Sequence, residues 1–314
     1  MAGARPDAPV RRDFLAADAG QDSFGWNIPN RAMKHALAAR LAAMPEVELR
    51  RGTAFRSRLA DLDAVEVGLS DGSRVSARLL IGADGRDSAV RAACGIGTRN
   101  WRSGQKALVF AVTHDAPHEG VSTEIHASGG PFTLVPLPDH EGRPCSAVVW
   151  MTEGREAARL LDLPPDAFAE AVNARSAGVM GPLVPVGPRQ LWPVLTRIAD
   201  RLTARRTALM AEAAHVVPPI GAQGLNMSLA DLGALMDLAR SRPEAIGSEG
   251  WLAAYARRRE GDIRLRAAGI ALLNRASMAG ALPLVALRGL GLRALHGVRP
   301  VRHGLMRLGL RAGG

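Results

Sequence analysis

Residues 211–231, AEAAHVVPPIGAQGLNMSLAD, constrain the fold of this chain more than any other stretch. They follow a β-like run over residues 207–210 and pack two prolines and two glycines into seven residues. They then open into an apolar-periodic segment, residues 225–239, that predicts a helix. A glycine-rich turn between a buried strand and a helix N-terminus can aim backbone N–H groups at an anionic or electron-rich ligand. We therefore expect this turn to hold a cofactor.

Length and composition indicate a globular protein. The 314 residues are 47% hydrophobic, enough for one large or two ordinary domains. The N-terminal residues lack the apolar core of a signal peptide, and no run of about 18 uncharged apolar residues occurs, so we expect a chain that does not span a membrane. The two cysteines imply no disulfide, so a reducing cytoplasm is the expected compartment. Cys94 and Cys145 lack metal-ligand spacing, so no metal site is predicted.

The formal charge of +10 is carried by residues 257–314, which hold twelve arginines against Glu260 and Asp262. Two interpretations of residues 284–310 are open. They predict either helices that lie peripherally on the anionic inner face of a membrane, or ordinary helix packing with a solvated arginine face. Nucleic-acid binding is not expected, because few aromatic residues and no base-reading motif accompany the charge.

The predicted elements indicate a mixed α/β fold. A helix is expected over residues 31–43, with Asn30 as its N-cap and Met33, Leu37 and Leu41 on one face. A hairpin over 65–69 and 74–81 turns at Asp71-Gly72 and ends in LLIG, a run typical of a strand entering a buried sheet. Further strands are expected at 10–15, 24–28, 47–49, 53–59, 107–113, 122–127, 132–136, 145–151, 190–198 and 204–210, and further helices at 88–93, 153–161, 166–174 and through 230–310, with breaks at Pro243, Pro283 and Pro300.

A second Asp-Gly pair, Asp84-Gly85, lies just beyond the apolar run, at the end of a strand where α/β proteins place ligands. The Asp84 carboxylate can accept hydrogen bonds from ribose hydroxyls or can fix loop amides, and both alternatives stay open. Gly85 permits the close backbone approach that a pyrophosphate needs.

Within residues 211–231, Glu212 can bind a polyol hydroxyl of a ligand or cap the following turn. Gly221 and Gly224 let the backbone pass close to a flat ring such as an isoalloxazine, whose reduced form carries negative charge that a helix N-terminus stabilises. A tightly packed turn without a ligand is the alternative. We interpret His215 as structural rather than as an acid or base.

LLIGADGRDSAVR (79–91) and AEAAHVVPPIGAQGLNMSLAD together resemble the paired motifs of the single-component FAD-dependent aromatic hydroxylases, the fold of para-hydroxybenzoate hydroxylase. FGWNIPNRAM (24–33), GPFTLVPLPD (130–139) and YARRREGDIRLR (255–266) are similar to the ubiquinone-biosynthesis branch of that family. The resemblance implies FAD as cofactor, NAD(P)H as reductant, and transfer of one oxygen atom of O2 to a phenolic ring that can be lipid-linked. A ubiquinone-biosynthesis complex is a further expected partner.

The resemblance also assigns cofactor-binding residues. Asp84 and Gly85 would meet the pyrophosphate and ribose region, and Glu212 the ribityl chain. No side chain need act as a nucleophile, because the flavin carries out the chemistry. The isoalloxazine would be lined by Pro219, Gly221, Gln223, Gly224, Leu225 and Asn226, with Arg31 as a further cofactor contact.

Two departures from the family pattern shape the expectation. Ala211-Glu212 replaces the usual Gly-Asp, and the GxGxxG turn with which the family begins does not occur in the sequence. We expect an FAD-binding Rossmann-like domain that lacks its first unit. The alternative to an active hydroxylase is a truncated, non-catalytic remnant or interaction subunit that does not retain FAD.

The expected domain organisation has four segments. They are the remaining FAD-binding part (1–100), an inserted antiparallel β-sheet substrate domain (101–200), the isoalloxazine and ribityl motif (201–245), and C-terminal helices (246–314).

Overall fold

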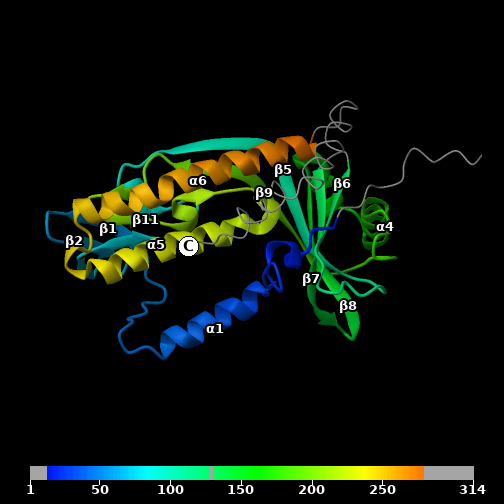
Figure 1. Ribbon diagram of the computed structural model, residues 1–314, viewed down its shortest axis with the longest axis horizontal. Coiled ribbons are helices and arrows are strands. Elements are labelled where there is room, and N and C mark those ends of the chain that lie inside the picture. The colour runs from blue at the N-terminus through cyan, green and yellow to red at the C-terminus, as the bar shows by residue number, and fades with distance from the viewer. Residues whose placement is uncertain (1–12, 128–129, 279–314) are drawn as a thin grey trace, which may run out of the picture.

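A six-stranded antiparallel sheet forms one end of the molecule in the computed structural model, which describes residues 13–127 and 130–278 (Figure 1). It contains the strands expected between residues 107 and 151, so the predicted antiparallel layer is confirmed. In spatial order the strands are β12 (His215–Val216), β9 (Val184–Ala199), β5 (Thr98–Thr113), β8 (Arg143–Glu153), β7 (Gly130–His140) and β6 (Thr123–Ala127).

The two faces of this sheet are covered differently. Helices α3 (Gly154–Leu161) and α4 (Pro165–Ser176) pack on one face, where the rings of Phe168 and Phe110 lie 4.9 Å apart. Successive side chains of a strand point to opposite faces, and those that point to the other face form a smaller apolar group. This group packs against Ile220. That second face therefore borders the glycine-rich turn.

The other end of the molecule is built around a short parallel pair. β4 (Leu80–Gly82) runs parallel to β11 (Thr207–Leu209), which also pairs with β10 (Thr203–Ala204). Packing is close here, because a Cβ on Gly82 would lie 2.8 Å from the Leu209 side chain and 2.9 Å from Val90 of α2 (Ala89–Ala93). Helices α5 (Gln223–Ser241) and α6 (Glu249–Met278) contribute half of the buried residues of this core.

The predicted hairpin is formed by β2 (Val65–Leu69) and β3 (Arg74–Ala77), with β1 (Phe55–Ala60) paired to β2. Gly72 has φ +83°, and Asp71 accepts hydrogen bonds from the Ser73 N–H and hydroxyl, so Asp71-Gly72 is a turn as expected. The returning strand is not continuous to residue 81. It breaks after β3, because the Leu80 N–H donates to the Arg206 carbonyl and β4 joins the other sheet.

One face of α6 is buried along nearly its whole length. The buried positions recur every three or four residues, as expected for a helix that packs on a core. Because α6 runs past α5 and β9 toward β5, it contacts both ends of the molecule (Figure 1). Its buried residues are Trp251, Leu252, Tyr255, Arg259, Ile263, Ala267, Ile270 and Asn274.

The N-terminal segment departs most from expectation. The predicted helix is present as α1 (Asn30–Ala42), but Pro29 occupies the cap position, so Asn30 is not the N-cap. None of its residues is buried, and Leu37 is 58% exposed, so its apolar face lies apart from the described cores (Figure 1). Residues 13–15, 24–28 and 47–49 form no strand in the described structure, since a short apolar run needs a neighbouring strand to pair with. A single 3-10 turn (Ala16–Ala19) precedes α1 there.

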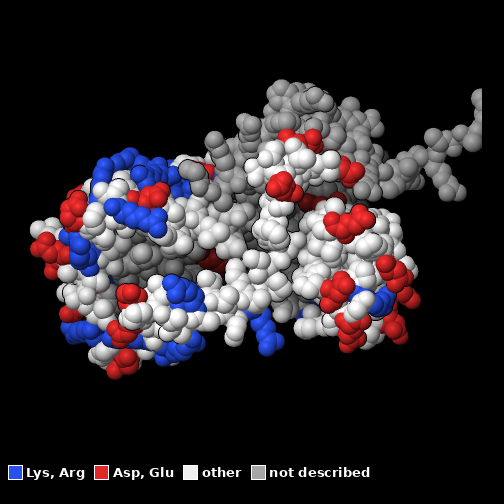
Figure 2. All heavy atoms as spheres, turned by 60° about the horizontal axis from the view of Figure 1, so that its bottom comes forward, with Lys and Arg blue, Asp and Glu red and all other residues white. Residues whose placement is uncertain are grey.

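Charge is unevenly distributed over the surface. Figure 2 shows basic side chains gathered over the end that carries β1, β2 and α5. Mainly acidic side chains lie over the end formed by the six-stranded sheet. None of the helices within the described ranges combines the length and the apolar content needed to cross a bilayer. The elements expected at residues 10–12 and beyond residue 278, including the basic helices of 284–310, lie outside the described residues.

Candidate functional site

Both sequence motifs follow the carboxyl ends of the parallel pair β4 and β11. Residues 80–82 are in register with residues 207–209, so the two chains leave the sheet at the same edge. Such an edge is where α/β proteins bind ligands. The structure thus brings together Asp84-Gly85 and Glu212, which are more than 120 residues apart in sequence.

The Asp84 carboxylate is already engaged by its own loop. It accepts hydrogen bonds from the Ser88 hydroxyl at 2.5 Å and from the Val90 N–H at 3.0 Å, while Ser88 Oγ caps α2 by accepting from the Arg91 N–H at 2.9 Å. The sequence left two functions open for Asp84, and in the structure its carboxylate fixes a loop amide. Contact with a cofactor stays a prediction. Gly85 has φ +85°, and a Cβ there would meet open space.

Glu212 lies in a 3-10 turn (Ala211–Ala213) directly after β11 and is about half exposed. Its two carboxylate oxygens each lie 3.3 Å from the guanidinium of Arg86, which belongs to the Asp84-Gly85 loop. Arg91 links the same two loops. Its guanidinium donates to the Ala213 carbonyl at 2.9 Å and to the Arg86 carbonyl at 3.0 Å. Burial lowers the pKa of Arg91, although these carbonyl contacts compensate for part of its lost hydration.

The glycine-rich turn faces outward. It contains a 3-10 turn (Ile220–Ala222) in which Gly221 has φ +64°, followed by Ala222 with φ +51°. Ala222 is the N-cap of α5, and no described side chain caps the helix, so no side chain competes with a ligand for its first N–H groups. Pro219, Gly221, Gly224 and Leu225 are exposed around this helix end, whereas Gln223 and Asn226 are half-buried.

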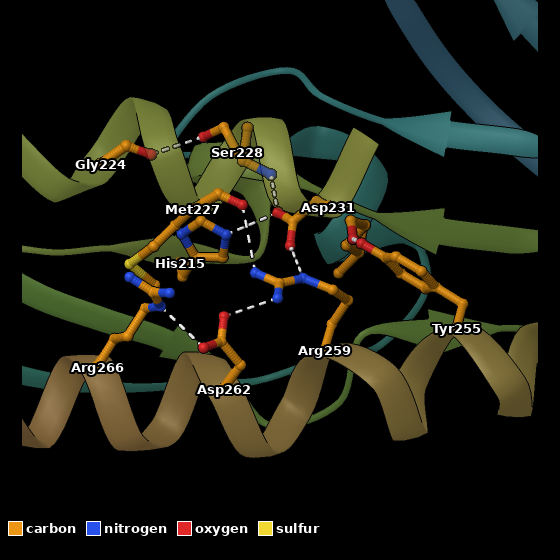
Figure 3. A network of polar contacts seen from close by, with 11 residues as sticks. His215, Gly224, Met227, Ser228, Asp231, Tyr255, Arg259, Asp262 and Arg266 are labelled. Atoms are coloured by element: carbon orange, nitrogen blue, oxygen red, sulfur yellow. Dashed lines mark hydrogen bonds and ion pairs between the residues drawn. The ribbon is translucent and has the colours of Figure 1, made fainter. Parts of the chain in front are cut away.

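A buried network supports the turn from behind (Figure 3). Asp231 of α5 is fully buried, and its carboxylate accepts hydrogen bonds from His215 Nε2 at 2.7 Å, from the Ala211 N–H at 3.0 Å and from Arg259 Nε at 2.8 Å. Because a carboxylate can only accept, His215 must donate from Nε2. His215 is 3% exposed, in agreement with its interpretation as a structural residue.

The network continues along α6 to the turn. Arg259 donates to Asp262 at 2.7 Å, Asp262 accepts from Arg266 at 2.8 Å, and Arg266 donates to Gln223 Oε1 at 3.0 Å. Gln223 Nε2 in turn donates to the Gly221 carbonyl at 3.1 Å. Partial burial opposes ionisation of Asp262, but hydrogen bonds from Arg266 and Arg259 hold its pKa below the usual value.

A cavity of about 290 Å³ lies beside the turn, between the β5–β9 ribbon and α6. Buried Pro218 forms part of its wall, so the cavity borders the segment predicted to hold the isoalloxazine. Its lining is largely apolar, with three alanines on one face of α6. The residues are Trp101, Arg102, Ser103, Val194, Leu195, Thr196, Ile198, Pro218, Arg264, Ala267, Ala268, Ala271 and Asn274.

Arg31 does not join the site. It lies on the exposed helix α1 and makes no hydrogen bond or ion pair with any residue in the described ranges. Sequence reasoning also missed the carboxylate–guanidinium network. A signal was present, because Arg259, Asp262 and Arg266 are spaced three and four residues apart and so share a helix face.

Comparison with known proteins identifies the family of this chain. Residues 16–261 match the FAD binding domain family. The chain is 33% identical over 303 residues to the ubiquinone hydroxylase UbiL of Rhodospirillum rubrum, covering 96% of this chain and 70% of that protein. It is 32% identical over 332 residues to the human mitochondrial ubiquinone biosynthesis monooxygenase COQ6, covering 91% of this chain and 70% of that protein.

A solved structure shares the fold. The anhydrotetracycline hydroxylase OxyS from Streptomyces rimosus superposes with a TM-score of 0.65 at 23% identity, over 90% of this chain. This chain spans 56% of the length of OxyS and about 70% of the length of UbiL and COQ6.

Proposed function

This chain belongs to the FAD binding domain family of flavin-dependent hydroxylases, and we propose that it hydroxylates a phenolic ring of a ubiquinone precursor with NAD(P)H as reductant. One structural observation carries the proposal. The two motifs meet at the edge of the β4–β11 pair, where an uncapped helix N-terminus and an apolar cavity lie together. The names of UbiL and COQ6 support the substrate class.

The residues of the turn fit the ring end of FAD. Gly221 and Gly224 are exposed, and a Cβ on Gly224 would meet no atom within 4 Å, so a flat ring can approach the backbone. The free N–H groups at the start of α5 would stabilise negative charge on the reduced ring. Glu212, beside Arg86, would hold hydroxyls of the ribityl chain. When bound, FAD supplies the activation of O2 and the oxygen atom that reaches the substrate.

The contribution of the protein itself is position, electrostatics and exclusion of water. Pro218 and Pro219 stiffen the turn, and the network behind it fixes Gln223 and the Gly221 carbonyl. The phenol would lie in the adjacent cavity, whose apolar wall keeps water from the reacting carbon. No side chain is required to form a covalent bond with the substrate.

Cofactor binding is the first test. The purified chain should take up FAD on titration, with a shifted flavin spectrum, and should then consume O2 with NAD(P)H in the presence of a prenylated phenol. Mass spectrometry should find one oxygen atom from 18O2 in the product. A chain that binds FAD but leaves every phenol unlabelled would contradict the hydroxylase assignment.

A non-catalytic interaction subunit is the second candidate, and exposed apolar side chains along α5 favour it. Leu225, Leu229, Leu232 and Met236 are each 40–52% exposed and share one side of the helix. A chain that stays colourless after FAD titration but elutes as a defined complex with other ubiquinone-synthesis proteins would favour this candidate over the enzyme.

We also propose that the enzyme is cytoplasmic and acts at the inner membrane face, where a lipid-linked phenol would be found. The arginine-rich residues beyond 278 would contribute electrostatic attraction to anionic lipid. Flotation with vesicles of phosphatidylglycerol should recover the chain at low salt and release it at high salt. Absence of flotation at low salt would remove the membrane contact.

A further inference from the structure

Two buried amides lie where α6 meets the ribbon. Asn274 of α6 lines the cavity described above, and Gln105 of β5 is its hydrogen-bond partner. The Asn274 amide nitrogen donates to Gln105 Oε1 at 2.7 Å, and the two residues are only 5% and 3% exposed. The pair joins segments 169 residues apart, so it forms only in the folded chain.

Only half of the hydrogen-bonding groups of this amide pair have a partner among the described residues. Asn274 Oδ1 and Gln105 Nε2 are buried and have no hydrogen-bond partner among the described residues. Reversing both amides does not change the count, because a single amide–amide hydrogen bond always leaves one donor and one acceptor unused. Buried polar groups are normally paired, so an unused donor and acceptor in a pair that reaches the cavity through Asn274 point to a ligand hydroxyl.

The backbone is shaped to place Gln105 there. β5 shifts register against β9 between Arg102 and Lys106, and Gly104 within this bulge has φ +73°. The chain also passes close to Gly154, where a Cβ would lie 2.9 Å from the Gly104 carbonyl oxygen. Bulges redirect side chains at functional sites, so the position of Gln105 is a specific feature of the fold.

The chemistry of the cavity selects the ligand class. Ala267, Ala268 and Ala271 leave a smooth apolar wall, and the volume of about 290 Å³ suits one aromatic ring with a short substituent. A phenolic hydroxyl both donates and accepts, which matches the unused acceptor and donor, whereas a carboxylate can only accept. Asn274 is a residue of the cavity wall, so a ring bound in the cavity lies against this residue.

We propose that Asn274, supported by Gln105, is the specificity-determining anchor that binds the ring hydroxyl of a phenol in this cavity. The identification of that phenol as the hydroxylation substrate rests on the proposed function. The anchor itself is a property of the cavity and can be measured without FAD.

Binding of phenol and of toluene, which has the same ring without the hydroxyl, tests the anchor. Both probes are titrated into the full chain by ligand-observed NMR. Asn274→Leu should weaken phenol binding about tenfold and change toluene binding less than twofold, because only phenol loses a hydrogen-bond partner. Gln105→Leu should give the same pattern. Equal losses for both probes, or an unchanged phenol affinity, would overturn the proposal.

Ala268→Leu is the matched control, because it fills the cavity without touching the amide pair and should weaken both probes alike. Circular dichroism confirms that each variant is folded, and Asn274→Ala replaces the leucine variant should that one unfold. Discrimination between the probes in a chain that shows no hydroxylase activity would refute the proposed function alone. Hydroxylase activity without discrimination would refute the anchor alone.

Discussion

The two sides of the α5 N-terminus are built in opposite ways. Behind it, the Asp231 carboxylate is fully buried and receives three hydrogen bonds, one of them from a guanidinium. In front, the helix start has no side-chain cap among the described residues, and two successive residues have positive φ. The difference shows how a short turn can be rigid and still present unused N–H groups to a ligand, because the constraint is applied from the other side.

The largest expected effect comes from disrupting the buried network behind the turn. Arg259→Met removes the cation that faces Asp231 and leaves a buried carboxylate without its strongest partner. We expect a loss of about 3–5 kcal/mol in the free energy of unfolding, measured by urea denaturation. Arg264→Met is the control, since Arg264 lies on the same helix but is 65% exposed, and its loss should be under about 1 kcal/mol. Similar losses in both variants would show that the network is not the support we describe.

A smaller effect should appear on acidification. The pKa of Asp262 is lowered in the folded chain, so its contribution to stability is present above its unfolded pKa and is lost as pH falls through the folded value. Below about pH 4 the wild type should therefore lose stability more steeply than Asp262→Asn. Asp237→Asn, at an exposed position on α5, serves as the control and should keep the wild-type slope in denaturation curves collected from pH 6 to pH 3.

A substitution on the exposed front of the turn should raise stability and weaken FAD binding. Gly224→Ala adds a methyl group in open space within α5, so it should raise stability by about 0.5–1 kcal/mol. The same methyl would stand where a flavin ring approaches, so FAD affinity should fall. Gly233→Ala, at an exposed position nine residues further along α5, should give the stability gain alone. If both variants bind FAD like the wild type, the ring does not lie at Gly224.

The smallest expected effect concerns Ala211, which has φ +53° at the junction of the two sides. Ala211→Gly relieves a left-handed conformation, at the expense of greater freedom in the unfolded chain. The net gain should stay under about 1 kcal/mol in thermal unfolding. Ala254→Gly, within helix α6, should instead lose about 1 kcal/mol. A clear loss in Ala211→Gly would show that the strain is absent.

Much of this arrangement could be predicted from local sequence. The Asp71-Gly72 turn and the antiparallel sheet follow from alternation and turn residues, whereas the pairing of the two motifs was implied by the family resemblance. The exposure of α1 could not be predicted in this way, because periodicity identifies an apolar face but not whether another element covers it. Pairs such as Asn274–Gln105 were also beyond reach, since nothing local in either segment indicates the other.

The long ribbon of β5 and β9 limits how the molecule can move. Each strand has 16 residues, and their ladder runs from Thr98–Ala199, beside the motif strand β12, to Thr113–Val184 within the sheet. A hinge between the two cores would have to break several ladder hydrogen bonds at about 1 kcal/mol each. We therefore expect ligands to enter by displacement of side chains, and not by a hinge opening of one core against the other.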